Sequence, residues 1–117
     1  MLTSELKVYK DMVTLTNKVL DAREHFSKGF KYAFGDRLLM TALDCCELIQ
    51  FANMDRVKRF QYLTDFTAKF GTLRLMLSIC RDRRQITLTQ ATDFILLIDE
   101  VGKEITGWKK SSLKPES

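Results

Sequence analysis

Apolar residues recur every three or four positions over four long stretches of the chain, with short polar segments between them. This spacing places the apolar residues on one face of an α-helix. The chain has no Asn-Gly or Asp-Gly turn and no sustained alternation of apolar and polar residues, so strands are not expected. The only proline is Pro115, so no strong helix breaker interrupts the first 114 residues. The pattern therefore predicts an all-α fold.

Helical patterns cover most of the sequence. The four predicted helices span about 4–23, 35–53, 55–81 and 87–110. Ser4 can cap the first helix, and Thr87 with Gln90 three residues later matches the capping box at the start of the fourth. Residues 25–34 read as a connector that holds several aromatic residues. Because aromatic side chains bury large apolar areas, we expect this connector to pack against the helices.

Long helices with short connectors are typical of a four-helix bundle in which neighbours run antiparallel. We expect one bundle domain over residues 1–110 and a disordered tail over residues 111–117. The third helix has more apolar residues than one buried face needs, since Leu75, Met76 and Ile79 lie away from its main stripe. One chain cannot easily cover all of this surface, so the sequence predicts a subunit interface.

The cysteines and the hydropathy pattern indicate a reduced, cytoplasmic protein. No apolar run reaches the ~20 residues that a membrane span needs, and no apolar signal segment follows Met1. The cysteine count of three is odd, and Cys45 and Cys46 are adjacent, which does not fit a disulfide framework. These two residues and Cys80 lie among apolar neighbours, as buried core thiols do. We expect no membrane partner.

The excess positive charge is concentrated between residues 54 and 86. This segment holds eight basic and three acidic residues, whereas the whole chain has a net charge of +4. The arginines of the segment are Arg56, Arg59, Arg74, Arg81, Arg83 and Arg84. At about 100° per residue, Arg74 and Arg81 project side by side from a helix. A basic surface of this kind suggests an acidic partner, most simply nucleic acid.

The competing interpretation is a solvated charged face that only keeps the protein soluble, which is the usual role of such charges. Within residues 54–86, however, Arg outnumbers Lys six to two, whereas elsewhere Lys outnumbers Arg nine to two. Arg is the better residue for bidentate contact with phosphate. The composition therefore favours binding to a phosphate backbone, which would be electrostatic and weakly dependent on nucleotide sequence.

The chain offers no pattern typical of an enzyme or a metalloprotein. The single histidine, His25, has no clustered Cys partners at zinc-ligand spacing, and no Glu-x-x-His motif indicates a di-iron bundle. A Cys–His nucleophilic pair needs both side chains within hydrogen-bond reach, but the cysteines fall on helical core stripes. No Gly-rich phosphate loop is present. We expect no catalytic residue, no metal and no cofactor.

Three segments, taken together, resemble a known family. They are Phe-Ser-Lys-Gly-Phe-Lys-Tyr-Ala-Phe-Gly-Asp-Arg-Leu at 26–38, Phe-Gly-Thr-Leu-Arg-Leu-Met-Leu at 70–77, and Ile-Thr-Leu-Thr-Gln at 86–90 followed by Ile-Asp-Glu-Val-Gly-Lys-Glu-Ile-Thr-Gly-Trp-Lys at 98–109. Their order and spacing resemble the accessory variability determinant (Avd) proteins of diversity-generating retroelements, over about residues 6–110. These proteins belong to a larger group that includes the 23S rRNA intervening-sequence proteins. The intervening-sequence proteins carry a Ser-Ile-Pro…Asn-Ile-Ala-Glu-Gly run on the second helix. This chain lacks that run, and its absence favours the Avd branch.

The resemblance implies a four-helix protomer that assembles into a barrel-like homopentamer. It also implies binding to the element's reverse transcriptase and to nucleic acid, template RNA and possibly DNA, in support of mutagenic cDNA synthesis without catalytic residues of its own. The family's basic surface maps onto the six arginines named above, with Lys103, Lys109 and Lys110 as weaker candidates. Two alternatives remain open: a structural or regulatory oligomer related to the intervening-sequence proteins, and a small enzyme.

Overall fold

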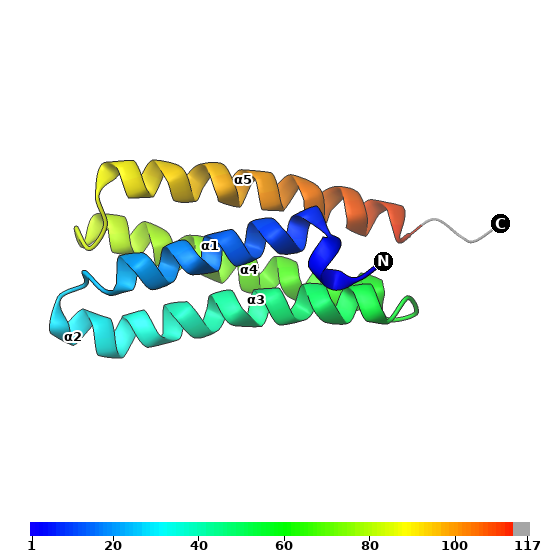
Figure 1. Ribbon diagram of the computed structural model, residues 1–117, viewed down its shortest axis with the longest axis horizontal. Helices are drawn as coiled ribbons and strands as arrows, with labels where there is room; N and C mark the ends of the chain where they lie inside the picture. Colours follow the sequence, from blue (N-terminus) through cyan, green and yellow to red (C-terminus); the bar gives the residue numbers. More distant parts are fainter. Residues whose placement is uncertain (114–117) are drawn as a thin grey trace.

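The computed structural model describes residues 1–113, and within them it holds four long helices and no strand (Figure 1). The long helices are α1 (Lys7–Arg23), α3 (Asp36–Met54), α4 (Arg59–Asp82) and α5 (Leu88–Ser111). Three shorter elements are the 3-10 helix η1 (Thr3–Glu5), α2 (Lys28–Phe30) and the π-helical segment η2 (Lys31–Gly35). The predicted all-α fold and the four-helix bundle are confirmed.

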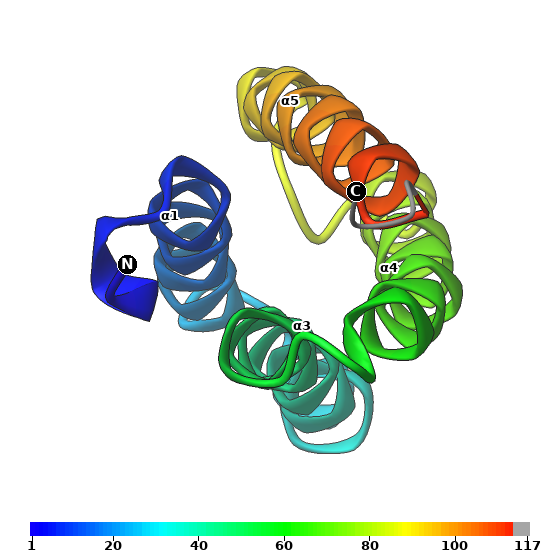
Figure 2. The same ribbon diagram turned by 90° about the vertical axis from the view of Figure 1, so that its right-hand side faces the viewer.

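The four long helices surround one hydrophobic core in the order α1, α3, α4, α5 (Figure 2). Each helix packs against the next, and α5 closes the ring against α1. The apolar stripe predicted for the third helix is buried along its length: Leu63, Phe66, Phe70, Leu73, Leu77 and Cys80. Neighbouring helices are antiparallel, since Asp44 of α3 pairs with Lys69 of α4 and Arg74 of α4 pairs with Asp99 of α5.

Two helix starts differ from the sequence prediction. Ser4 does not cap α1, because it lies inside the preceding 3-10 turn and the helix begins only at Lys7. The third helix begins at Arg59 rather than near Asp55, because the Asp55 carboxylate accepts a hydrogen bond from the Lys58 backbone N–H at 3.1 Å. Such a local bond offers the backbone an alternative to the helix. Arg56 therefore lies in the turn before α4 and not on its surface.

The predicted connector at 25–34 is mostly helical. From Lys28 the chain runs through α2 and the π-helical segment directly into α3. Phe26, Phe30 and Phe34 form a stack with ring centroids 5.2 and 4.6 Å apart, whereas Tyr32 is 60% exposed. The three phenylalanines pack as expected. The prediction of a non-helical connector was wrong. One helical stretch containing a π turn connects α1 to α3.

The capping box at the start of α5 is confirmed. The Gln90 backbone N–H donates to the Thr87 hydroxyl at 3.1 Å, and the Thr87 backbone N–H donates to the Gln90 side chain at 2.9 Å. These two bonds satisfy orphan backbone groups at the helix end. The last turn of α4 and the first turn of α5 therefore have a fixed connection, which orients the residues between them.

The three cysteines are buried and free. Burial raises the pKa of the Cys45 thiol to about 12, and burial also raises the pKa of Cys80 to about 12. Thiolate is the nucleophilic form, so we expect all three thiols to react with Ellman's reagent at pH 8 at least about 100-fold more slowly than after denaturation. Rapid labelling of all three in the folded protein would contradict this packing.

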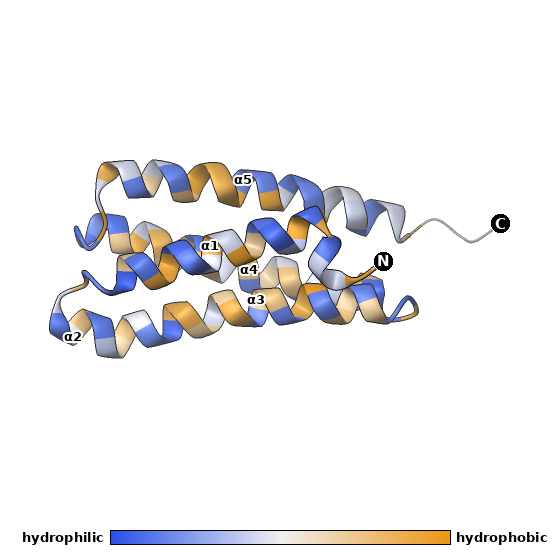
Figure 3. Cartoon of the chain, viewed as in Figure 1, coloured by the Kyte–Doolittle hydropathy of each residue, from blue (hydrophilic) through white to orange (hydrophobic). Residues whose placement is uncertain are grey.

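Several large apolar side chains lie on the outside of the bundle. Hydrophobic and hydrophilic positions alternate in short groups along the long helices (Figure 3). Met40 is 57%, Leu75 59% and Leu96 64% exposed. The sequence prediction was wrong for Met76, which turns into the core, and Ile79 is half-buried. The remaining exposed apolar surface still spans α3, α4 and α5. Among the described residues, no helix combines the length and apolar content that crossing a bilayer requires.

Candidate nucleic-acid interface

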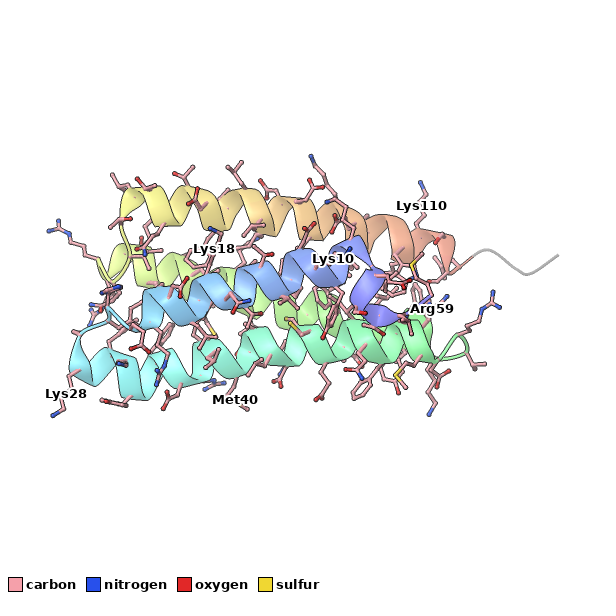
Figure 4. All side chains as sticks on the ribbon, in the orientation of Figure 1. Lys10, Lys18, Lys28, Met40, Arg59 and Lys110 are labelled. Atoms are coloured by element: carbon pink, nitrogen blue, oxygen red, sulfur yellow. The ribbon has the colours of Figure 1, made fainter. Side chains whose placement is uncertain are left out.

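The six arginines do not form one continuous stripe. Arg59 opens α4 and Arg81 lies one residue before its end. At 1.5 Å rise per residue, these positions are about 33 Å apart along the helix axis. Figure 4 shows the same separation, since Arg59 and Lys110 lie at one end of the bundle and Lys28 at the other. The charges therefore occupy two ends of the bundle, with Arg74 between them.

Arg59 is held inside the fold. Its Nε donates to the Ala52 carbonyl at 2.7 Å, and one terminal nitrogen donates to the Asn53 carbonyl at 3.2 Å. Its guanidinium lies over the Trp108 ring, 5.4 Å from the centroid. These contacts tie the end of α3 and the start of α4 to α5. The geometry indicates a structural role for Arg59, and it places Trp108 against the core as a half-buried anchor.

The other basic residues at this end and on α5 are dispersed. Arg56 is exposed in the turn before α4. The ammonium group of Lys109 lies over the Phe60 ring at 5.2 Å, and Lys103 and Lys110 are exposed. Lys103 is more than a helical turn from Lys109 and Lys110. The fold therefore does not gather these residues into one patch with the end of α4.

Arg74 lies on the side of the bundle and faces an acid of its own chain. Its guanidinium is 3.5 Å from the Asp99 carboxylate of α5, and both side chains are more than half exposed. An ion pair of this kind contributes little stability, about 0 to 1 kcal/mol, because water screens it and two long side chains must be ordered. Arg74 can therefore exchange Asp99 for another acid.

The second end of the bundle gathers basic residues from two connectors. Arg83 and Arg84 follow α4, are exposed, and have no ion pair within the described residues. Arg81, in the last turn of α4, pairs with its neighbour Asp82 at 3.2 Å. Lys28 begins α2 and is exposed at the same end (Figure 4). We call Arg81, Arg83, Arg84 and Lys28 the connector cluster.

Gln85 holds the two connectors together. Its side-chain oxygen accepts a hydrogen bond from the Ser27 backbone N–H at 2.9 Å, and its side-chain nitrogen donates to the Arg83 carbonyl at 3.2 Å. The residue before Lys28 is thereby fixed beside the residues that follow α4. Sequence reasoning missed Lys28, because no pattern in the sequence places residue 28 next to residue 85.

Arg84 adopts a backbone conformation that normally favours glycine. Its φ is 56°, and within residues 1–113 no other non-glycine residue has a positive φ. The Arg84 N–H donates to the Arg81 carbonyl and the Gln85 N–H to the Cys80 carbonyl, which is the Schellman pattern that ends helices. A side chain in this region costs about 1 kcal/mol relative to glycine. An arginine where glycine fits better makes Arg84 a candidate for a functional side chain.

This conformation gives a test of whether the charge is functional. Arg84→Gly is expected to leave stability unchanged or raise it by up to about 1 kcal/mol, because glycine relieves the left-handed backbone. The same variant should bind RNA more weakly, since one phosphate contact is lost. Urea denaturation and a filter-binding titration measure the two effects. Asparagine also tolerates this φ, so Arg84→Asn removes the charge without relieving the backbone as glycine does, and it is the matched control. Undiminished RNA affinity in both variants would contradict a functional Arg84.

A group of acids beside α1 is explained by an ion pair. Asp11, Glu100 and Glu104 each place an oxygen within 4.8 Å of the others. The Lys7 ammonium donates to Asp11 at 2.8 Å, to Glu100 at 2.9 Å and also to Glu104. These three hydrogen bonds raise the pKa of Lys7 above its usual value. The cluster thus clamps the start of α1 to α5. His25 is exposed, whereas the three cysteines are buried.

The fold and its basic end define a small all-α bundle whose most distinctive surface is cationic. The sequence profile of the bAvd-like family matches residues 6–112, which is almost the entire bundle. The chain therefore belongs to the bAvd-like family. A comparison with curated proteins gives no match. The resemblance to Avd proteins drawn from the sequence is confirmed at the level of the family.

Proposed function

We propose that this chain is a non-catalytic accessory protein that binds the reverse transcriptase of a diversity-generating retroelement and nucleic acid, and so supports mutagenic cDNA synthesis. The family match over residues 6–112 is the observation that carries the proposal. The architecture agrees with an accessory role, because apolar side chains fill the bundle interior. The function then resides on the outer surface.

The connector cluster is the best-supported contact for nucleic acid. Arg83 and Arg84 are exposed and have no acidic partner in the described part of the chain, and the Gln85 side chain bonds to Ser27, the residue before Lys28. Phosphate contacts from such residues release counterions, so the affinity should fall steeply as salt rises and depend little on nucleotide sequence. The single chain supplies only a few contacts. Repetition in an oligomer would raise the affinity through multivalency.

We expect the oligomer to be a homopentamer. The exposed side chains of Met40 on α3 and Leu75 on α4 support association, since a subunit contact would bury this apolar surface. Multi-angle light scattering should give a mass near five times the 13.6 kDa of one chain. A stable monomer at micromolar concentration would contradict this prediction.

The proposal is tested with the reverse transcriptase encoded in the same locus. The two purified proteins should co-elute from a sizing column, and this chain should bind the element's template RNA in a gel shift whose affinity decreases with salt. A chain that assembles but binds neither component would instead be the structural or regulatory oligomer that the sequence left open. A locus without any reverse transcriptase gene would also contradict the proposal.

A further inference from the structure

An apolar groove runs along the side of the bundle between the second half of α4 and the first half of α5. Its cavity volume is about 170 Å³, and its floor is formed by Leu77, Phe94, Ile95 and Ile98. Arg74 and Arg81 stand on the α4 rim, and Asp99 stands on the α5 rim. Ile95 is 49% exposed, whereas Leu77, Phe94 and Ile98 are buried, so solvent reaches the apolar lining mainly at Ile95.

The spacing and charge of the arginines that line the groove favour one kind of occupant. Arg74 and Arg81 are seven residues apart, which on a helix is two turns or about 10.5 Å. Two turns of a partner helix present anchors of the i, i+4, i+7 type over the same length. The rim arginines favour an acidic partner, and the weak Arg74–Asp99 pair at 3.5 Å is exposed enough to be exchanged for a partner carboxylate.

We propose that this groove docks a two-turn, acidic amphipathic helix from a partner protein. An apolar floor gives no contact to phosphate, so the groove fits protein rather than nucleic acid, which the connector cluster contacts instead. The identity of the partner as the reverse transcriptase rests on the proposed function, whereas the groove and the chemistry of its occupant do not. Protein docking and nucleic-acid binding thus use separate surfaces, with Arg81 at the boundary between them.

The structure provides a matched pair of substitutions. Ile95→Glu places an acid on the groove floor at a half-exposed position, so the fold should tolerate it. Leu96→Glu places the same acid one residue further on, at a position that is 64% exposed and outside the groove. Both variants replace a branched apolar side chain by glutamate and have the same change in charge. Circular dichroism and light scattering should show both folded and equally assembled.

The probe is a fluorescein-labelled 14-residue helix with a lactam bridge, Leu or Phe at i, i+4 and i+7, and Glu at the flanking positions. Fluorescence anisotropy should show binding at least about tenfold tighter than for a scrambled peptide or for the analogue with Lys in place of Glu. Ile95→Glu should weaken binding by about tenfold or more, and Leu96→Glu by less than about twofold. A probe that binds no better than its scrambled form, or equally well to both variants, would overturn the proposal.

Three further outcomes are decisive. Shifts of the Ile95 and Ile98 methyl resonances that depend on protein concentration without peptide would show that a second copy occupies the groove, and this would overturn the proposal. Because the peptide assay contains no polymerase and no RNA, peptide binding without reverse transcriptase binding would defeat only the proposed function. Reverse transcriptase that binds Ile95→Glu and the wild type equally would remove the groove as its docking site.

Discussion

Replacing Arg81, Arg83 and Arg84 by glutamate is expected to weaken binding to single-stranded RNA by about 100-fold. The three residues stand together at the end of α4, and Arg83 and Arg84 have no ion pair within the described residues. Their reversal removes phosphate contacts and adds repulsion. Filter binding at several salt concentrations measures both the affinity and its salt dependence. Each lost contact should reduce the slope of log K against log salt by about 0.7 to 0.9.

The control has the same change in net charge at dispersed positions. Lys10, Lys58 and Lys103 are exposed and lie on α1, in the turn before α4 and on α5. Their replacement by glutamate should lower the RNA affinity by only a few-fold, because it changes only the overall electrostatic potential of the protein. Equal losses in the two triple variants would mean that net charge alone attracts RNA, and that the connector cluster is an ordinary solvated surface.

Trp108→Ala is expected to destabilise the fold by about 3 kcal/mol, at the lower end of the usual range for removing a large aromatic side chain. The indole packs against the core and lies under the Arg59 guanidinium, 5.4 Å away. Its loss leaves a cavity and removes the cation–π contact. Urea denaturation of the variant measures the change, while RNA affinity at low temperature should stay near that of the wild type.

Arg59 provides the control for this second prediction. Arg59→Ala alone should also destabilise, and in the Trp108→Ala background its effect should shrink, because the pair shares one contact. An unchanged melting temperature for Trp108→Ala would mean that the indole is available to a partner. A large loss of RNA affinity for Arg59→Ala, with stability intact, would mean that Arg59 contacts nucleic acid.

The helices could be read from the sequence because their stabilising pattern is local and periodic. The stripe from Leu63 to Cys80 is buried as predicted, and the Thr87–Gln90 capping box forms as predicted. The errors lie at helix ends where a side chain forms a hydrogen bond with a backbone group. Asp55 bonds to Lys58 and delays α4, and the stacked phenylalanines accompany a π turn that no simple helical period describes.

The candidate site was less accessible to sequence reasoning, because it depends on long-range placement. The six arginines are close in sequence but lie at the two ends of the bundle, with Arg74 between them. The hydrogen bonds that Arg59 donates to the Ala52 and Asn53 carbonyls follow only from the packing of α3. Lys28 joins the connector cluster through the Gln85–Ser27 bond, which links residues 58 positions apart. Composition thus suggested a class of partner, and the structure narrows the proposed contact to the residues at one end of the bundle.

The central claim is that this bAvd-like chain supports mutagenic reverse transcription by binding the polymerase and its template. Reconstituted cDNA synthesis from the element's template RNA, with purified reverse transcriptase and with or without this chain, tests it most directly. The account predicts that full-length, mutated cDNA requires the chain, that the Arg81/Arg83/Arg84→Glu variant fails to support it, and that the Lys10/Lys58/Lys103→Glu variant succeeds. The same yield and the same substitution frequency in the absence of the chain would contradict the account.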